Sequence, residues 1–155
     1  IVTGDWSSDV CSSDLLFILF SCQKTDIEIY NGRDTNIENL YGNWIVINYW
    51  ADWCAPCIKE IPELNNFAKN NPDILVFTFN FDFLEEDELG PIAEKFKIQI
   101  PSLISHPSSI WGIETPPAIP ATYFINPKGD IVLSLFKPQT EETLNKILNN
   151  LKNEI

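Results

Sequence analysis

Two cysteines separated by two residues carry the most specific chemical signal in this chain. Cys54 and Cys57 stand in the run Trp-Cys-Ala-Pro-Cys, after an apolar run and before a helical pattern. Such a pair can cycle between a dithiol and a disulfide, and its thiolate attacks other disulfides. The pair therefore predicts a redox site whose only redox-active group is a Cys54–Cys57 disulfide, with no cofactor.

A metal site is the main alternative for a Cys-x-x-Cys pair. Structural zinc needs four Cys or His ligands. Beyond this pair the chain offers His106 and two N-terminal cysteines, with no second pair at zinc spacing. The pair alone can bind Cu(I), but the scarcity of histidine and the absence of methionine count against a copper-handling protein. We expect no bound metal, and His106, next to Pro107, is expected in a surface turn.

The elements around the cysteines predict how they are placed. Trp44–Trp50 is β-branched and aromatic with only Asn48 polar, which is typical of a central strand covered on both faces. A helix then begins at Cys54, and Pro56 is tolerated in its first turn because an N–H there would have no intrahelical partner. The dipole of that helix should stabilise the Cys54 thiolate, whereas Cys57 should be more buried and less acidic.

The rest of the chain predicts an α/β protein with a central mixed β-sheet flanked by helices. The first helix is expected to end near Asn70 and to bend at Pro62, which removes a hydrogen bond. Residues 98–113 predict only a short strand, a turn and a helical turn. Further strands are expected at 74–81, 121–126 and 131–136, and further helices at 85–96 and 140–151.

Length and charge limit the classes of function. The 155 residues, 45% hydrophobic and 21% charged, suffice for one globular domain, and no internal repeat is present. The chain has 10 basic and 22 acidic residues, which give a net charge of −12, and the basic residues form no stripe. We therefore predict no nucleic-acid partner.

The N-terminal residues carry signals unrelated to catalysis. Asp5–Leu15 resembles the translation of a sequencing-adapter oligonucleotide, so we interpret residues 1–15 as non-native. Residues 16–22 resemble the end of a lipoprotein signal peptide whose lipobox cysteine is Cys22, with a simple secretory signal or a buried strand as alternatives. Lipidation with more than one acyl chain would anchor the protein to a membrane. Residues 23–35 would then form a tether, and 36–155 the folded domain.

The order of elements over roughly residues 36–151 resembles the thioredoxin fold. Within that superfamily, the motifs resemble the TlpA/ResA-type extracytoplasmic thiol-disulfide oxidoreductases. They are Trp53-Cys54-Ala55-Pro56-Cys57 with Glu60 and Pro62, an acidic insertion before Pro101, and Ile119-Pro120-Ala121-Thr122. The resemblance implies a thioredoxin-like domain that faces the periplasm of a Gram-negative bacterium and serves reductive tasks such as cytochrome c maturation. It also implies that Pro62 marks a helix kink common in the family.

The resemblance implies roles for residues outside the pair. Pro120 would be a cis-proline facing the cysteines, and Ile119 would offer its backbone to an extended substrate segment near Trp53; an ordinary trans-proline is the alternative. Asn48 stands where thioredoxins have a buried aspartate. The carboxylate near the pair would instead be Glu60, one helical turn after the second cysteine, where it could accept a proton. The alternative is a solvated helix residue.

These signals together predict a protein-disulfide reductase. The Cys54 thiolate would attack a protein disulfide, Cys57 would resolve the mixed disulfide while Glu60 takes up a proton, and a membrane electron donor would re-reduce the pair. The alternatives are a Cu(I)-handling protein and a thiol peroxidase, since thiol peroxidases share this fold.

Overall fold

The computed structural model describes residues 26–154, so the expected adapter-derived segment, the signal-peptide remnant and Cys22 lie outside the described residues. In chain order the elements are β1 (Ile29–Tyr30), a 3-10 helix (Ile37–Asn39), β2 (Ile45–Trp50), α1 (Ala55–Asn70), β3 (Leu75–Asn80), α2 (Glu86–Lys95), β4 (Ser102–Leu103), α3 (Pro107–Trp111), β5 (Ala121–Ile125), β6 (Ile131–Leu135) and α4 (Glu141–Asn153). Within this part of the chain no helix is long and apolar enough to cross a membrane.

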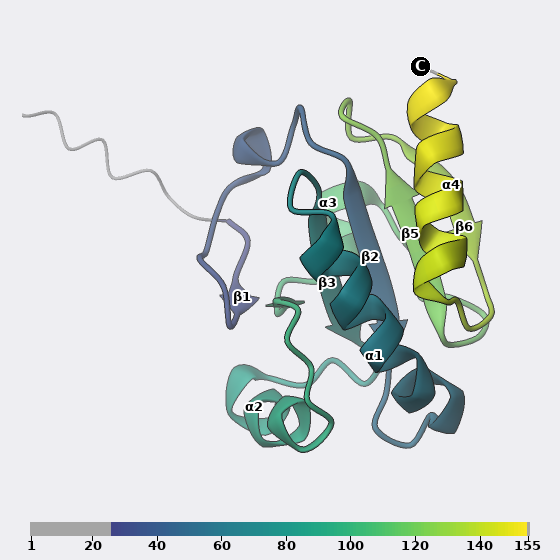
Figure 1. Cartoon of the computed structure of the whole chain (residues 1–155). Helices are drawn as coiled ribbons and strands as arrows, with labels where there is room; N and C mark the ends of the chain where they lie inside the picture. The colour runs from purple at the N-terminus through teal and green to yellow at the C-terminus, as the bar shows by residue number, and fades with distance from the viewer. Residues whose placement is uncertain (1–25, 155) are drawn as a thin grey trace, which may run out of the picture.

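The strands form one mixed sheet with the order β1-β4-β3-β2-β5-β6. β2 lies inside the sheet, parallel to β3 and antiparallel to β5 (Figure 1). Every residue of β2 is buried, which explains why its sequence is almost continuously apolar. The predicted α/β class and thioredoxin-like sheet are therefore confirmed.

Two apolar clusters cover the two faces of the sheet. On one face, Val46 and Trp50 of β2 pack with buried residues of α1, α2 and α4, such as Leu64, Leu89 and Leu148. On the other face, Tyr49 and its neighbours pack with the N-terminal segment and the α3 region. Figure 1 shows α1 and α4 side by side in front of the sheet. The redox pair at the start of α1 is thus supported by the first cluster.

α1 begins as predicted and contains two prolines. Pro56 occupies the first turn, where its missing N–H is tolerated, and Pro62 lies inside the helix. The helix nevertheless runs continuously to Asn70, so Pro62 does not interrupt it. Burial of Ile61, Leu64 and Phe67 on the sheet side supplies the packing that offsets the lost hydrogen bond.

The segment before residue 36, which the sequence predicts to be a tether, contributes a strand to the sheet. Ile29 and Tyr30 form β1, which pairs antiparallel with β4, and an isolated bridge joins Ile27 to Thr35. Ile27 is only 2% exposed and belongs to the core. The alternation Asp-Ile-Glu-Ile from Asp26 is the signal that could have revealed this edge strand.

Candidate redox site

Cys54 and Cys57 form a disulfide at the N-terminus of α1, with an S–S distance of 2.00 Å and a Cα–Cα distance of 5.2 Å. Cys54 is the N-cap residue, and its Sγ accepts a hydrogen bond of 3.3 Å from the backbone N–H of Cys57. Cys54 is 5% exposed and Cys57 is 1% exposed, which is the order expected from the sequence. A helix N-terminus favours an anion, so this position suits a Cys54 thiolate once the pair is reduced.

Glu60 is a buried carboxyl group one turn after Cys57 on α1, with only 2% of its surface exposed. Its Oε1 accepts a hydrogen bond of 2.9 Å from the backbone N–H of Gln139, and its Oε2 accepts one of 3.4 Å from Nδ2 of Asn48. Burial raises the pKa of Glu60 to about 7, although both hydrogen bonds act in the opposite direction. This carboxyl group can therefore gain or release a proton near neutral pH.

Asn48 links this carboxyl group to the neighbouring strand. Its Nδ2 also donates a hydrogen bond of 3.1 Å to Oγ1 of Thr122, which lies directly opposite Asn48 in the β2–β5 pairing. Asn48 is 1% exposed and Thr122 is fully buried. Asn48 was predicted from the sequence to lie near the pair. Its hydrogen-bond partner could not be predicted, because Thr122 is distant in the chain.

A buried polar row crosses the sheet at this level. Thr122, Asn48, Thr78 and Ser102 occupy paired positions on β5, β2, β3 and β4. All four are at most 2% exposed, and the hydroxyl groups of Thr78 and Ser102 are hydrogen bonded to each other. This row was not predicted from the sequence. Its signal was the polar residues Asn48, Thr78 and Thr122 within apolar stretches of the sequence.

The peptide bond between Ile119 and Pro120 is cis, as the family resemblance implied. β5 begins directly after Pro120, and its first residue, Ala121, pairs with Tyr49 near the end of β2. The same end of β2 leads into the cysteines. Pro120 and the disulfide therefore lie at the same ends of the neighbouring strands β5 and β2. Pro120 is buried, whereas Ile119 is partly exposed and available at the surface.

Trp53 presents an exposed aromatic surface immediately before Cys54. The side chain is 62% exposed, yet its Nε1 donates a hydrogen bond of 2.7 Å to Oδ2 of Asp82. Its ring also meets Phe81 edge to face, with 6.1 Å between centroids. These contacts from the loop after β3 hold the indole in place beside the disulfide while leaving much of it accessible.

His106 has a structural role as the N-cap residue of α3. Its Nδ1 accepts a hydrogen bond of 3.0 Å from the backbone N–H of Ser108. Its ring stacks on Phe83 with 4.8 Å between centroids and meets Phe79 edge to face. The chain offers no other histidine, and within residues 26–154 no group of three His, Cys, Asp or Glu side chains could hold a metal ion.

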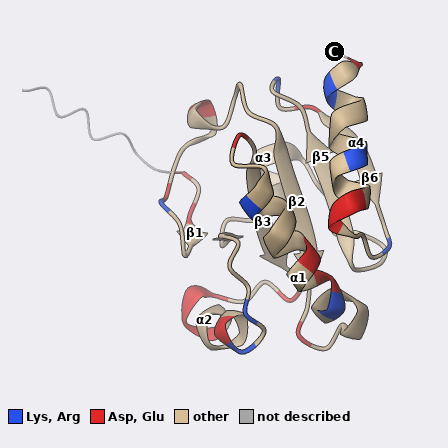
Figure 2. Ribbon diagram, in the orientation of Figure 1, with Lys and Arg blue, Asp and Glu red and all other residues tan. Residues whose placement is uncertain are grey.

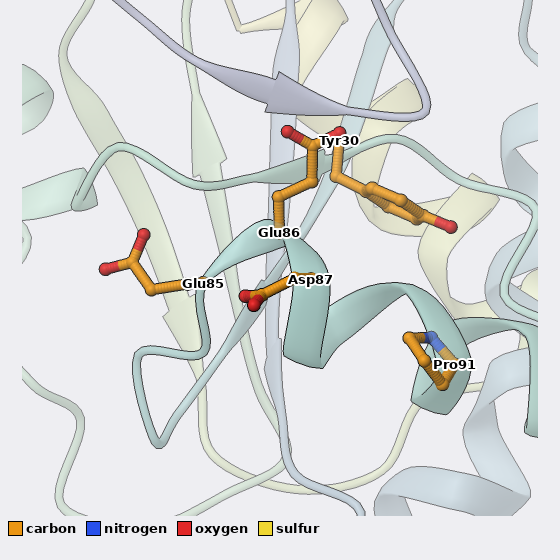
Figure 3. Close-up of a pocket in the computed structure, with 5 residues that line it drawn as sticks. All are labelled: Tyr30, Glu85, Glu86, Asp87 and Pro91. Carbon is orange, nitrogen blue, oxygen red and sulfur yellow. The ribbon is translucent and has the colours of Figure 1, made fainter.

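A separate surface pocket of about 600 Å³ lies between α2 and β1 (Figure 3). It is lined by Tyr30, Glu85, Glu86, Asp87 and Pro91. Figure 2 shows that acidic residues gather on α2. Acidic side chains stabilise the first turn of a helix, and the Glu88 carboxylate accepts a hydrogen bond of 3.4 Å from the backbone N–H of Glu85. The helix itself therefore explains this acidic group.

Comparison with known proteins gives a consistent family. The AhpC/TSA family model matches residues 18–134. The thiol-disulfide oxidoreductase ResA of Bacillus cereus is 26% identical over 129 residues, covering 82% of this chain and 72% of that protein. The sporulation thiol-disulfide oxidoreductase A of Bacillus subtilis is 26% identical over 117 residues, covering 73% and 70%.

Solved structures share the fold. StoA from Bacillus subtilis superposes with a TM-score of 0.62 at 22% identity, covering 79% of this chain and 96% of that one. A secreted disulfide oxidoreductase from Mycobacterium tuberculosis gives a TM-score of 0.59 at 18% identity, covering 83% and 96%. At these identities the structural likeness supports the thioredoxin-like fold alone.

Proposed function

Since this chain belongs to the AhpC/TSA family and is a thiol-disulfide oxidoreductase of the ResA type, we propose that it reduces disulfides in extracytoplasmic proteins. The observation that carries the proposal is the position of the Cys54–Cys57 disulfide at a helix N-terminus, with the buried Glu60 one turn further along the same helix. This arrangement supplies a nucleophile, a resolving thiol and a proton acceptor.

The first step is attack by the Cys54 thiolate on one sulfur of the substrate disulfide. A Cys54–substrate S–S bond forms, the substrate S–S bond breaks, and the second substrate sulfur leaves as a thiolate. In this proposal Trp53, which is 62% exposed, and the backbone of Ile119 before the cis-proline would hold the substrate segment beside the pair.

The second step releases the substrate. The Cys57 thiol gives its proton to the Glu60 carboxylate, and the resulting Cys57 thiolate attacks the sulfur of Cys54. The Cys54–Cys57 disulfide forms, and the remaining substrate sulfur leaves as a thiolate. Glu60 then returns its proton to solvent, and a membrane electron donor supplies two electrons that restore the dithiol.

The proposed location is the periplasmic side of a membrane, with Cys22 lipidated as the anchor and residues 1–15 not native to the protein. The sequence supports a location outside the cytoplasm, because the apolar run followed by Ser21-Cys22 has the pattern of a lipobox.

The redox potential of the pair tests the direction of electron flow. We would equilibrate the protein with dithiothreitol or glutathione and measure the fraction of Cys54–Cys57 disulfide. A value near that of thioredoxin, about −270 mV, supports a reductase, whereas a value near about −120 mV supports a disulfide-forming oxidase.

Insulin reduction by the wild type but not by Cys54→Ser is the matching activity measurement. Fast peroxide oxidation of Cys54 to a sulfenic acid without insulin reduction would replace the proposal with a thiol peroxidase.

A further inference from the structure

Glu60 receives hydrogen bonds from donors on both of its oxygens. The backbone N–H of Gln139 donates to Oε1, and Nδ2 of Asn48 donates to Oε2. This arrangement suits the ionised carboxylate, which only accepts hydrogen bonds. A neutral carboxylic acid carries an O–H that needs an acceptor, and here each contact would place that O–H against an N–H. A buried O–H without an acceptor is unfavourable.

The side chain of Asn48 can resolve this conflict because an amide has a donor end and an acceptor end of nearly equal size. A half-turn about the Cβ–Cγ bond exchanges Nδ2 and Oδ1, so that Oδ1 faces the O–H of the neutral acid. An aspartate, which the thioredoxins resembled by this chain have at the position of Asn48, has no amide donor and acceptor to exchange in this way.

Thr122 is the second partner of the same amide nitrogen, and its hydroxyl group can follow the half-turn. Its Oγ1 now accepts a hydrogen bond of 3.1 Å from Nδ2 of Asn48. A hydroxyl group can equally donate, so after the half-turn Thr122 donates to Oδ1 of Asn48. Because Thr122 is fully buried, no solvent water can take the place of Asn48 as the partner of this hydroxyl group.

We propose that Asn48 is a positioning residue whose side-chain amide turns over each time Glu60 gains or loses a proton, with the Thr122 hydroxyl reversing its own donor or acceptor role in the same movement. The proton itself moves between Cys57 and Glu60, and the amide turnover changes no covalent bond. A role of this rotation in catalysis rests on the proposed function of Glu60 as proton acceptor. The rotation of the Asn48 amide itself does not depend on that function.

The surroundings of Glu60 make Asn48 the side chain that responds. Charged groups on the packed elements are Lys59 and Glu63 on α1, Lys137 before Gln139, and Glu141 on α4. Lys59 and Lys137 are exposed, and Glu63 accepts a hydrogen bond of 2.9 Å from the backbone N–H of Glu141. Cys57 is held in the disulfide, and Tyr49 and Tyr123 belong to the cluster on the opposite face of the sheet.

Nuclear magnetic resonance on the whole chain in the oxidised state tests the proposal. The ¹³C shift of the Glu60 carboxyl and the ¹⁵N and ¹H shifts of the Asn48 side-chain amide are followed across neutral pH. We expect one shared midpoint. Cross-relaxation between the Asn48 amide protons and Thr122 should be strong above the midpoint and weak below it. Unchanged cross-relaxation through the titration of Glu60 would overturn the proposal.

Variants add a second measurement. Asn48→Leu removes the hydrogen bond to the ionised carboxylate and also the one to the neutral acid. Because the hydrogen bond to the charged form is the stronger of the two, the Glu60 midpoint should rise by about one pH unit. Thr122→Val leaves an amide N–H without an acceptor when Glu60 is ionised and should raise the midpoint by less, and Thr122→Ser should restore the wild-type midpoint. An unchanged midpoint in Asn48→Leu would contradict the proposal. Since no substrate is present, these results are independent of whether the chain reduces proteins.

Discussion

The backbone N–H of Gln139 donates a 2.9 Å hydrogen bond to Oε1 of Glu60, although the two residues are 79 positions apart in the chain. This bond ties the segment entering α4 to the carboxyl group that follows the redox pair. A second carboxylate one turn later repeats the arrangement, since Glu63 accepts the N–H of Glu141. The start of α4 is therefore fixed by two glutamates of α1, and only the first is deeply buried.

Replacement of Glu60 by Gln should change how stability depends on pH. Burial raises the folded-state pKa of Glu60 from 4.5 to about 7, so between these values the folded protein keeps a proton that the unfolded chain releases. Wild-type stability therefore falls as pH rises from about 4.5 to about 7 and then levels off. The total loss at this group is about 3 kcal/mol.

Urea unfolding of the oxidised wild type and of oxidised Glu60→Gln measures this effect. The measurements are made at pH 4.5, 6 and 8, which are roughly the ends and the middle of the Glu60 titration. The free energy of unfolding of Glu60→Gln relative to wild type should increase with pH, because the glutamine has no charge to bury. Glu63→Gln is the matched control and should show much less dependence, since Glu63 is partly exposed. A pH-independent difference between Glu60→Gln and wild type would contradict the raised pKa.

The two cysteines should give different products when each is replaced. Cys57→Ser retains the attacking thiolate and loses the resolving thiol, so we expect it to accumulate a mixed disulfide with insulin or another disulfide-containing protein. Cys54→Ser should form almost none. Non-reducing gel electrophoresis with mass spectrometry identifies the linked cysteine. Equal trapping by both variants would show that Cys57 can also attack substrate.

Removal of the Trp53 side chain should weaken substrate binding more than it affects the fold. The indole is 62% exposed and anchored to Asp82, so Trp53→Ala loses accessible apolar surface beside Cys54. We expect KM for a protein substrate to rise several-fold, on the order of 1 kcal/mol of binding, with a small change in Tm. Tyr41→Ala is the control, because Tyr41 is 52% exposed but precedes the opposite end of β2. Equal effects of both variants on KM would argue against a docking role.

The N-terminal edge strand should contribute to stability although the sequence predicts a tether at residues 23–35. Ile27 is 2% exposed, and Ile27→Ala should lower the free energy of unfolding by about 2–5 kcal/mol. Arg33→Ala, an exposed position in the same segment, should change it by less than about 0.5 kcal/mol. Denaturant unfolding measures both. A small effect of Ile27→Ala would mean that this segment acts as a tether after all.

The sequence alone determined the redox pair and the elements that carry it. An apolar strand, a Cys-x-x-Cys run with Pro56 and a helical pattern are local signals, because strand and helix periodicity and proline tolerance act over a few residues. The sequence also predicted the burial order of Cys54 and Cys57, since it follows from their positions within one helical turn. The role of Glu60 came from resemblance together with its spacing from Cys57.

Only the tertiary structure decided what surrounds that carboxyl group. Thr122 lies 74 positions from Asn48, and Asp82 lies 29 positions from Trp53, so no local pattern connects them. Strand order brought Thr122 opposite Asn48, and the packing of α4 against α1 brought Gln139 to Glu60. Desolvation and hydrogen-bond partners set a buried pKa, and both depend on residues that meet only when the sheet and helices are assembled.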